Sequence, residues 1–287
     1  MKRIGLVLSG GLGKGAYQIG AIRALSAYFR PEDFSCVSAA SIGALNGYAY
    51  MTHILEQAEH LWRTADFQGG MRSVVSVMRS AFLKDIIADH ISDGELPCPF
   101  YVPLYDLKHH TFDYFDFSRL PKEQLEHYFH AAISLPVATR GVTIGSETYY
   151  DGGVVDNIPV APLLKEQLDY IICIYFDEYY AFEDSEADGK IIKVTFPDDT
   201  VISNSVDIRH SSILYMIDEG YRRTKEILDG VFAGGTDRVE SVCEAIRKNN
   251  EQNPRRRKRI TMDVVITNLN RMMRKRERAM KRAEREK

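Results

Sequence analysis

A serine stands on a sharp turn between an apolar run and a helical pattern. The segment Ala39-Ala40-Ser41-Ile42-Gly43 follows the apolar run Phe34–Ala39 and opens a helix at about Ile42. A serine on such a strand-to-helix turn exposes its hydroxyl, and small neighbours let the strand and the helix pack closely. The helix N-terminus also favours negative charge developing beside that hydroxyl. The pattern predicts either a nucleophile at Ser41 or a serine that only caps the helix.

A glycine-rich segment precedes the first helical pattern. Ser9-Gly10-Gly11-Leu12-Gly13-Lys14-Gly15 joins the apolar run Ile4–Leu8 to that helix. Backbone N–H groups of such a loop can point at an anion, either a phosphate or the oxyanion of a tetrahedral intermediate. A phosphate-binding P-loop requires Ser or Thr after its Gly-Lys pair, whereas Gly15 follows Lys14 here. We therefore favour an oxyanion-binding loop over a nucleotide site.

A second acid-bearing turn comes much later in the chain. Asp151-Gly152-Gly153 begins a ten-residue stretch that ends in the turn signal Asn157-Ile158-Pro159. Asp-Gly is a common turn dipeptide, so the plain interpretation is a surface turn. The apolar residues around it indicate partial burial instead, and burial raises the pKa of a carboxyl group. Asp151 could then take a proton from a serine hydroxyl without the help of a histidine.

The elements before Ser41 predict that the first two motifs meet. Ile4–Leu8 reads as a buried strand, a helix follows from Gly15, and Phe34–Ala39 reads as the next strand. A strand, helix and strand in this order predict two parallel strands joined by a right-handed crossover. Both following loops then emerge at the same edge of the sheet, where open α/β sheets bind ligands.

The remaining pattern continues as alternating strands and helices, which indicates an α/β fold. We expect a hairpin of Tyr101–Leu107 and Thr111–Phe117, a helix from Pro121 to about Ile133, a short strand ending at Tyr150, strands at Tyr170–Phe176 and Ile191–Phe196, and helices over about 206–229 and 236–249.

The three motifs stand in an order that resembles the patatin-like phospholipase family. They are the glycine loop Ser9–Gly15, the serine turn from Ser41 to Asn46, and Asp151-Gly152-Gly153. The resemblance covers about residues 4–165. It implies a patatin-like three-layer α/β fold, with a central, mostly parallel sheet and helices on both faces. It also implies cleavage of acyl esters in lipids such as phospholipids, without calcium or another cofactor.

The resemblance further implies a role for each matching residue. Ser41 would be the nucleophile and Asp151 its base, forming a Ser–Asp dyad with a covalent acyl-serine intermediate. Backbone N–H groups of the glycine loop would form the oxyanion hole, and small or basic neighbours would support them. The oxyanion candidates are Gly10, Gly11, Leu12 and Gly13, and the supporting residues are Lys14, Gly43, Gly152 and Gly153.

Two positions depart from the family pattern. Leu12 stands where a third glycine is usual, and Ala39 stands where the serine turn usually begins with glycine. Leucine keeps its N–H, but a positive φ at that position would cost about 1–2 kcal/mol and could tilt the donor. The departures bear on rate and substrate fit more than on the class of reaction.

Two alternatives remain open at this stage. His210 follows Asp151 in the chain, as in a Ser–Asp–His esterase, although its surroundings resemble a helix start rather than a loop after a strand. The chain could also be a lipid- or protein-binding module on a catalytically impaired hydrolase fold. We expect no metal or organic cofactor under the favoured hypothesis.

The composition favours a cytoplasmic protein. Four cysteines, Cys36, Cys98, Cys173 and Cys243, lack metal-ligand or redox spacing, which is typical of a reducing compartment. No apolar run approaches the roughly 20 residues that cross a bilayer. The N-terminal apolar stretch is short and runs into glycines, so we predict a first strand rather than a signal peptide. Export by a dedicated secretion machine would leave the same features.

The charge is unevenly distributed along the chain. Residues 254–287 hold 14 Lys/Arg and 4 Asp/Glu, whereas residues 1–253 carry a net charge of −13. We predict a catalytic domain over 1–253 and a basic tail or helix over 254–287. The tail is either a solvated terminus or a peripheral contact with anionic membrane, and no specific nucleic-acid partner is expected.

A separate apolar stripe runs at near-helical spacing from Met71 to Ile91. Such a stripe usually belongs to the core. The alternative is a lid over an acyl pocket or a helix at the lipid interface.

Overall fold

The computed structural model of the 287-residue chain describes residues 2–64, 87, 95–136, 139–176, 180, 182, 188–196 and 209–252. The stripe from Met71 to Ile91, apart from Ile87, and the basic segment 254–287 lie outside these residues. Most of 177–190 and the expected start of the helix at 206 also lie outside them.

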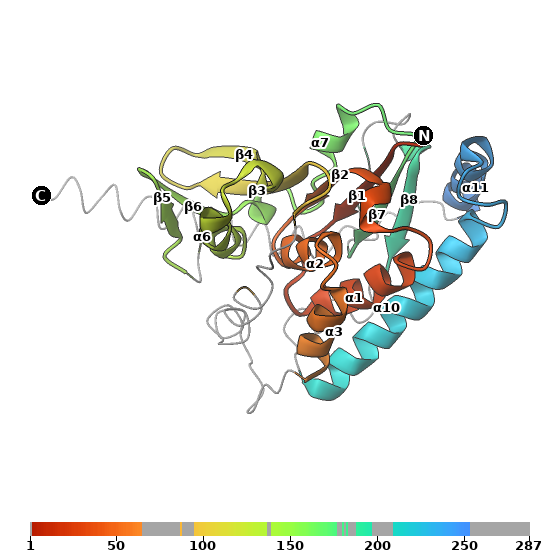
Figure 1. Cartoon of the computed structure of the whole chain (residues 1–287), viewed down its shortest axis with the longest axis horizontal. Coiled ribbons are helices and arrows are strands. Elements are labelled where there is room, and N and C mark those ends of the chain that lie inside the picture. Colours follow the sequence, from red (N-terminus) through yellow and green to blue (C-terminus); the bar gives the residue numbers. More distant parts are fainter. Residues whose placement is uncertain are drawn as a thin grey trace, which may run out of the picture.

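One half of the sheet is parallel. Within the described residues the strands follow the order β5-β6-β3-β2-β1-β7-β8, and β4 pairs with β3 (Figure 1). β1 lies between β2 and β7 and is parallel to both, and β8 continues the sheet beside β7. These four strands are almost wholly buried, which accounts for their continuous apolar sequences. Their bounds are β1 Ile4–Leu8, β2 Phe34–Ala39, β7 Tyr170–Tyr175 and β8 Ile191–Thr195.

The other half of the sheet is antiparallel. β3 starts parallel to β2 through two residue pairs, then pairs antiparallel with β4 and β6, and β5 pairs with β6. Several of these strands are only partly buried, because the half-sheet has one face towards solvent. Their bounds are β3 Phe100–Asp106, β4 Thr111–Asp116, β5 Val142–Ile144 and β6 Glu147–Asp151.

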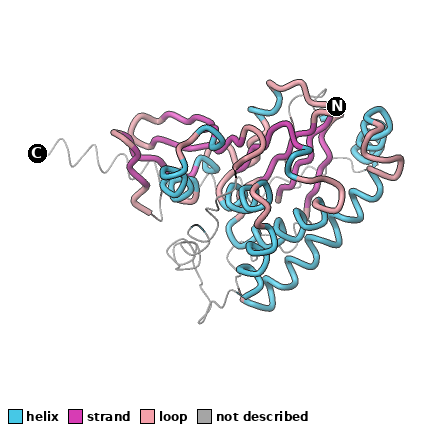
Figure 2. Tube along the Cα trace, viewed as in Figure 1, coloured by secondary structure: helices cyan, strands magenta, loops and turns pink. Residues whose placement is uncertain are grey.

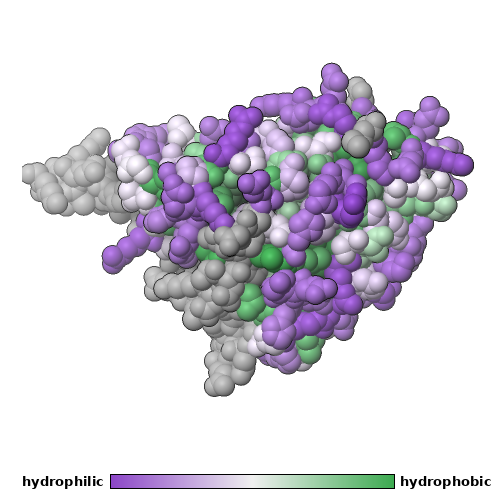
Figure 3. Space-filling view, in the orientation of Figure 1, coloured by the Kyte–Doolittle hydropathy of each residue, from purple (hydrophilic) through white to green (hydrophobic). Residues whose placement is uncertain are grey.

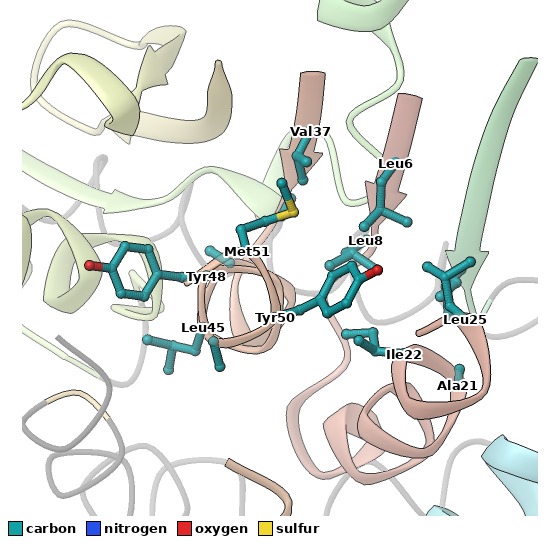
Figure 4. Close-up of a cluster of buried hydrophobic side chains, with 14 of the residues drawn as sticks. Leu6, Leu8, Ala21, Ile22, Leu25, Val37, Leu45, Tyr48, Tyr50 and Met51 are labelled. Atoms are coloured by element: carbon teal, nitrogen blue, oxygen red, sulfur yellow. The ribbon is translucent and has the colours of Figure 1, made fainter. Parts of the chain in front are cut away.

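Helices cover one face of the sheet in a thick layer (Figure 2). Leu6 and Leu8 of β1 and Val37 of β2 point into this layer, where they meet apolar side chains of α1 and α2 (Figure 4). The outward side of α3 and α10 is hydrophilic (Figure 3). The helices are α1 Gly15–Leu25, α2 Ile42–Met51, α3 Leu55–Thr64, α6 Lys122–Ala132, α10 His210–Val231 and α11 Val239–Gln252.

The contact between α1 and α10 is unusually close. A Cβ at Gly20 would lie 1.9 Å from the carbonyl oxygen of Ile217, and a Cβ at Gly220 would lie 2.1 Å from that of Tyr17. Only glycine allows two helix backbones to approach this far. The helix before the serine turn is therefore held against a helix about 200 positions later in the chain.

The opposite face of the sheet is covered more thinly. A second apolar cluster there packs Val7 of β1 and Cys36 of β2 against Val160 and Leu163, at the short helix α7 Ala161–Leu164. With helices on both faces of a mostly parallel sheet, the predicted three-layer α/β fold is confirmed. Most predicted elements are confirmed within a few residues, whereas α3, α7 and β5 were not predicted.

The described residues hold four cysteines. Cys36, Cys98, Cys173 and Cys243 are all free and buried. Within the part of the chain that the structure describes, no helix is both long enough and apolar enough to cross a membrane.

Candidate active site

The serine turn joins β2 to α2, as the sequence predicts, but Ser41 is buried, with 6% of its surface exposed. Ser41 has φ 54° and ψ −129° between β2 and α2, a backbone conformation that non-glycine residues rarely adopt. Its side chain makes no capping hydrogen bond to the helix, although it stands at the N-cap position. A Cβ at Gly43 would lie 2.7 Å from the carbonyl oxygens of both Leu8 and Ser9. Glycine there lets α2 begin directly against the end of β1.

The glycine loop lies beside this turn because β1 and β2 are parallel neighbours. Leu8 pairs with Ala39, and Ala40 donates its N–H to the Leu8 carbonyl at 3.0 Å. A Cβ at Gly10 would lie 2.9 Å from the Cβ of Ser41. The loop and the serine are therefore in direct contact, as the crossover argument predicts.

The N–H groups of the glycine loop differ in availability. Gly10 donates its N–H to the carbonyl oxygen of Asn157 at 3.2 Å, so this donor is already used. Within the described residues, no hydrogen bond is seen from the N–H groups of Gly11, Leu12 or Gly13. The N–H groups of Gly11, Leu12 and Gly13 therefore stay candidates for binding an oxyanion, while the bond from Gly10 ties the loop to Asn157.

Leu12 adopts the conformation that glycine would adopt without strain. Its φ is 51°, in the left-handed region, at the start of the 3₁₀ turn Leu12–Lys14. Leucine costs about 1–2 kcal/mol there relative to glycine. The strain foreseen for this departure from the family pattern is therefore present.

Lys14 is buried, with 2% of its surface exposed, at the start of α1. Its ammonium lies 5.6 Å from the centre of the Phe176 ring, within the range of a cation–π interaction. The supporting role that the resemblance implies for Lys14 stays a prediction.

Asp151 is the last residue of β6 and lies opposite Leu104 of β3. Its carboxylate accepts a hydrogen bond from the N–H of Gly153 at 2.8 Å. The Ser41 hydroxyl lies close enough to this carboxylate to lower its pKa. The side chain is 1% exposed, and its backbone N–H donates to Ser134 at 2.8 Å. The structure thus brings together the serine and the acid that the sequence selected.

The environment of Asp151 makes it an unusually strong base for a carboxylate. Burial raises its pKa from 3.8 to about 7, against the opposing effect of hydrogen bonds from Ser41 and Gly153. Gly152 lets the turn lie against β3, since a Cβ there would be 2.4 Å from the carbonyl carbon and oxygen of Pro103. The turn is therefore buried, which contradicts the surface-turn alternative.

Asn157 connects the acid turn to the glycine loop. Its side-chain amide donates to the Gly10 carbonyl at 3.2 Å, and its own carbonyl accepts from Gly10. Its Oδ1 would be 2.4 Å from a Cβ at Gly10 and 3.1 Å from one at Gly153. In the sequence Asn157 signalled only a turn, and no local pattern shows that its partner is about 150 residues away.

His210 is placed away from these contacts. It is the exposed first residue of α10, and the described interactions of Asp151 are with Ser41 and Gly153. Helix α10 packs on α1, in the layer beside the sheet. The geometry gives no support to a triad that uses this histidine.

One group of potential metal ligands occurs among the described residues. Ligand atoms of Asp106, His109 and Glu147 lie within 4.8 Å of one another. His109 Nδ1 lies 2.6 Å from Asp106 and 3.0 Å from Glu147, and Asp106 also accepts the N–H of Lys108 at 2.8 Å. These contacts account for the arrangement as a hydrogen-bonded cluster at the end of the β3–β4 hairpin.

The α/β sheet, the serine turn beside a glycine loop and the buried acid define a patatin-like site. A family model described as Patatin-like phospholipase matches residues 6–164, which is more than half of the chain. The chain belongs to the patatin-like phospholipase family, as its motifs predict.

Individual relatives are more distant. Lysophospholipase NTE1 from two strains of Cryptococcus neoformans var. neoformans serotype D is 27% identical over 194 residues. The match covers 60% of this chain but only 11% of those proteins. VipD from Legionella pneumophila is 13% identical with a TM-score of 0.49, covering 80% of this chain and 67% of that structure. The ExoU–SpcU complex from the type III secretion system of Pseudomonas aeruginosa is 14% identical with a TM-score of 0.41, covering 88% of this chain and 58% of that one.

Proposed function

We propose that the chain is a serine lipid acyl hydrolase, with Ser41 as nucleophile and Asp151 as its base. The closeness of the Ser41 hydroxyl to the Asp151 carboxylate, in a buried site beside N–H groups that make no described hydrogen bond, carries the proposal. Membership of the family supports lipid esters as substrates. The name of the fungal relatives favours a phospholipid or lysophospholipid among those esters.

The reaction follows from the positions of three groups. Asp151 takes the proton as Ser41 Oγ attacks the ester carbonyl, and the N–H groups of Gly11, Leu12 and Gly13 stabilise the oxyanion. Collapse of the tetrahedral intermediate breaks the ester bond, and Asp151 returns the proton to the departing alcohol. Water then attacks the acyl-serine with Asp151 as base, which releases the fatty acid and restores the serine hydroxyl.

The raised pKa of Asp151 suits this role. A carboxylate with a pKa of about 7 accepts a proton from a hydroxyl more readily than one with a pKa of 3.8. Each step uses groups of the chain itself, so we propose that activity needs neither calcium nor an organic cofactor.

We further propose that residues 1–253 form the catalytic domain and that the basic segment 254–287 brings it to anionic membrane. The acidic body, with a net charge of −13, would be repelled by such a surface, whereas the segment carries +10. Each Lys or Arg near an anionic surface contributes about 1 kcal/mol. This proposal fits a cytoplasmic protein that associates peripherally with the membrane.

The test is hydrolysis of a nitrophenyl butyrate and of a lysophospholipid by the wild type and by Ser41→Ala. We expect turnover by the wild type in the presence of EDTA, no turnover by the variant, and labelling of Ser41 by a fluorophosphonate. A folded wild type that neither hydrolyses these esters nor reacts with the fluorophosphonate would overturn the proposal. The binding-module alternative would then be favoured.

A further inference from the structure

Three buried side chains form a continuous chain of hydrogen bonds behind the glycine loop. Trp62 of α3 donates to Asn46 of α2 at 3.1 Å, and Asn46 donates to Gln18 of α1 at 3.0 Å. Asn46 also donates to the Gly15 carbonyl at 3.0 Å, and Gln18 donates to the Ser9 carbonyl at 3.0 Å. Gln18, Asn46 and Trp62 are 0%, 1% and 2% exposed. We call these three side chains the amide chain.

The direction of the amide chain follows from the chemistry of its ends. The Trp62 indole can only donate, so the oxygen of the Asn46 amide must face it. The nitrogen of Asn46 then faces the Gly15 carbonyl and the Gln18 oxygen, which both accept. The nitrogen of Gln18 is left for the Ser9 carbonyl, which also can only accept. One orientation satisfies every bond, and a buried network of this kind specifies a single arrangement.

The two backbone carbonyls that accept hydrogen bonds from the amide chain belong to the first and last residues of the glycine loop. Ser9 begins the loop and Gly15 closes it, while the oxyanion candidates lie between them. Asn46 is on the helix that Ser41 opens, so the same side chain belongs to the nucleophile's helix and contacts the loop. Trp62 also packs on the loop, because a Cβ at Gly15 would be 2.7 Å from its ring.

We propose that Gln18 and Asn46 are positioning residues that set the glycine loop relative to Ser41. This inference rests on the proposed function, in which the loop supplies the oxyanion donors. The side chains act through the loop backbone and need not touch the substrate. A misplacement of about 1 Å at an active site can cost about 100-fold in rate. The loss should fall on the step that forms the oxyanion rather than on binding.

The test compares Gln18→Met with Tyr50→Phe. Methionine keeps the length of glutamine but removes the bonds to Ser9 and Asn46. Tyr50→Phe is the matched control, because it removes a buried 2.7 Å hydrogen bond from α2 to the Phe29 carbonyl without contact with the loop. Rates are expressed per serine titrated with a fluorophosphonate, so a misfolded fraction does not count. Trp62 is the single tryptophan of the chain, so its emission reports on the far end of the amide chain.

We expect Gln18→Met to lower kcat by about 10- to 100-fold, with KM within about twofold. Affinity for a trifluoromethyl ketone, which forms a tetrahedral adduct, should fall in parallel with kcat. Tyr50→Phe should retain kcat even where its melting temperature falls, and Trp62 emission should be unchanged in both variants. Equal kcat in Gln18→Met and the wild type would overturn the proposal, as would an equal loss in both variants.

A second measurement does not depend on turnover. Amide hydrogen exchange of the peptide covering residues 9–15 should be faster in Gln18→Met than in Tyr50→Phe or the wild type. Unchanged exchange would overturn the positioning role even in an active enzyme. Absence of wild-type turnover together with faster exchange would instead overturn the proposed function while keeping the structural role of the amide chain.

Discussion

Ser41 and Asp151 come from two differently built halves of one sheet. Ser41 follows β2 in the parallel half, where strands are buried on both faces and a helix begins directly after the turn. Asp151 ends β6 in the antiparallel half, where strands are partly exposed and the acid turn lies against β3. The site lies where the halves join, at β3, which pairs with strands of both kinds.

The two halves fix their side chains by different means. The serine is held by a strained backbone and by the helix behind it, whereas the acid is held by burial and by a hydrogen bond from Gly153. Strain sets the direction of a side chain, and burial sets its pKa. The comparison shows how one buried site can combine a strained backbone at Ser41 with a raised pKa at Asp151.

The largest expected effect comes from removing either partner. Ser41→Ala and Asp151→Asn should each lower kcat for a soluble ester by at least about 1,000-fold. His210→Ala should retain most activity, because its exposed side chain makes no described contact with the dyad. Steady-state kinetics on proteins with wild-type circular dichroism measures this. Comparable losses in His210→Ala and Ser41→Ala would restore the triad hypothesis.

The next largest effect is expected from replacing the two glycines that let each turn pack against a neighbouring strand. A Cβ at Gly152 would be 2.4 Å from the Pro103 carbonyl group, and one at Gly43 would be 2.7 Å from two carbonyl oxygens. Overpacking of this kind costs about 1–3 kcal/mol, so both alanine variants should unfold at lower urea concentration. We expect Gly152→Ala to be the less stable of the two. The reverse order would show that the acid turn yields more easily than the serine turn.

The pH dependence should separate activity from stability. Activity should rise with pH through about 7, because Asp151 must lose its proton to act as base. Folded Asp151 keeps its proton to about pH 7, whereas an unfolded one loses it near 3.8. The folded state therefore binds more protons between these values, so the contribution of Asp151 to stability falls as pH rises through this window.

Melting curves of the wild type and Asp151→Asn between pH 5 and pH 8 test the predicted loss of stability. The variant lacks this titration, so the wild type should lose stability relative to it as pH rises. A difference in melting temperature that stays constant with pH would mean that the pKa of the Asp151 carboxyl is not raised. A kcat profile without an inflection near pH 7 would argue against Asp151 as the base.

A smaller effect is expected at Leu12. Glycine there would relieve about 1–2 kcal/mol of left-handed strain and lose about 0.5–1 kcal/mol through greater freedom of the unfolded chain. Leu12→Gly should therefore change the free energy of unfolding little. It should raise kcat by less than tenfold, where tenfold corresponds to about 1.4 kcal/mol in the barrier. A marked fall in kcat would mean that the leucine side chain contacts the substrate.

The smallest effect on catalysis is expected from deleting residues 254–287. Turnover of a soluble ester should be nearly unchanged, because the deletion leaves the site's residues in place. Sedimentation with vesicles of anionic phospholipid at low salt should fall, since the segment carries the positive excess. Equal vesicle binding by both forms would end the membrane role of the segment.

The parallel half could be predicted more fully than the antiparallel half. Continuous apolar runs, such as those of β1 and β2, indicate buried strands and place the serine turn beside the glycine loop. β5 was missed because it has only three residues, none of them buried, and α7 was missed because it has only four. Short elements of this kind give too few residues to show a period.

Some residues of the site could also be predicted from the sequence, whereas others could not. Ser41, Asp151 and the glycine loop carry local sequence signals, and the cost of Leu12 followed from the left-handed backbone that the family pattern suggests. Asn157 and Gln18 act through partners brought close by the fold, and a single sequence contains no sign of such pairs. The apolar neighbours of Asp151 predict that its pKa is raised. The size of the shift could not be predicted, because it depends on complete burial of the carboxyl group.

The close contact of Gly20 with α10 has a consequence for how the protein is made. β1 and α1 are synthesised first, whereas β7 and α10, which pack against them, are made about 165 and 200 residues later. At about 5–20 residues per second, the intervening 200 or so residues take roughly 10–40 s to synthesise. During that interval α1 lacks the contact with α10. A growing chain therefore carries Ser41 long before the helix that bears the glycine loop is fully packed, so we expect catalytic competence to begin only after α10 has been made.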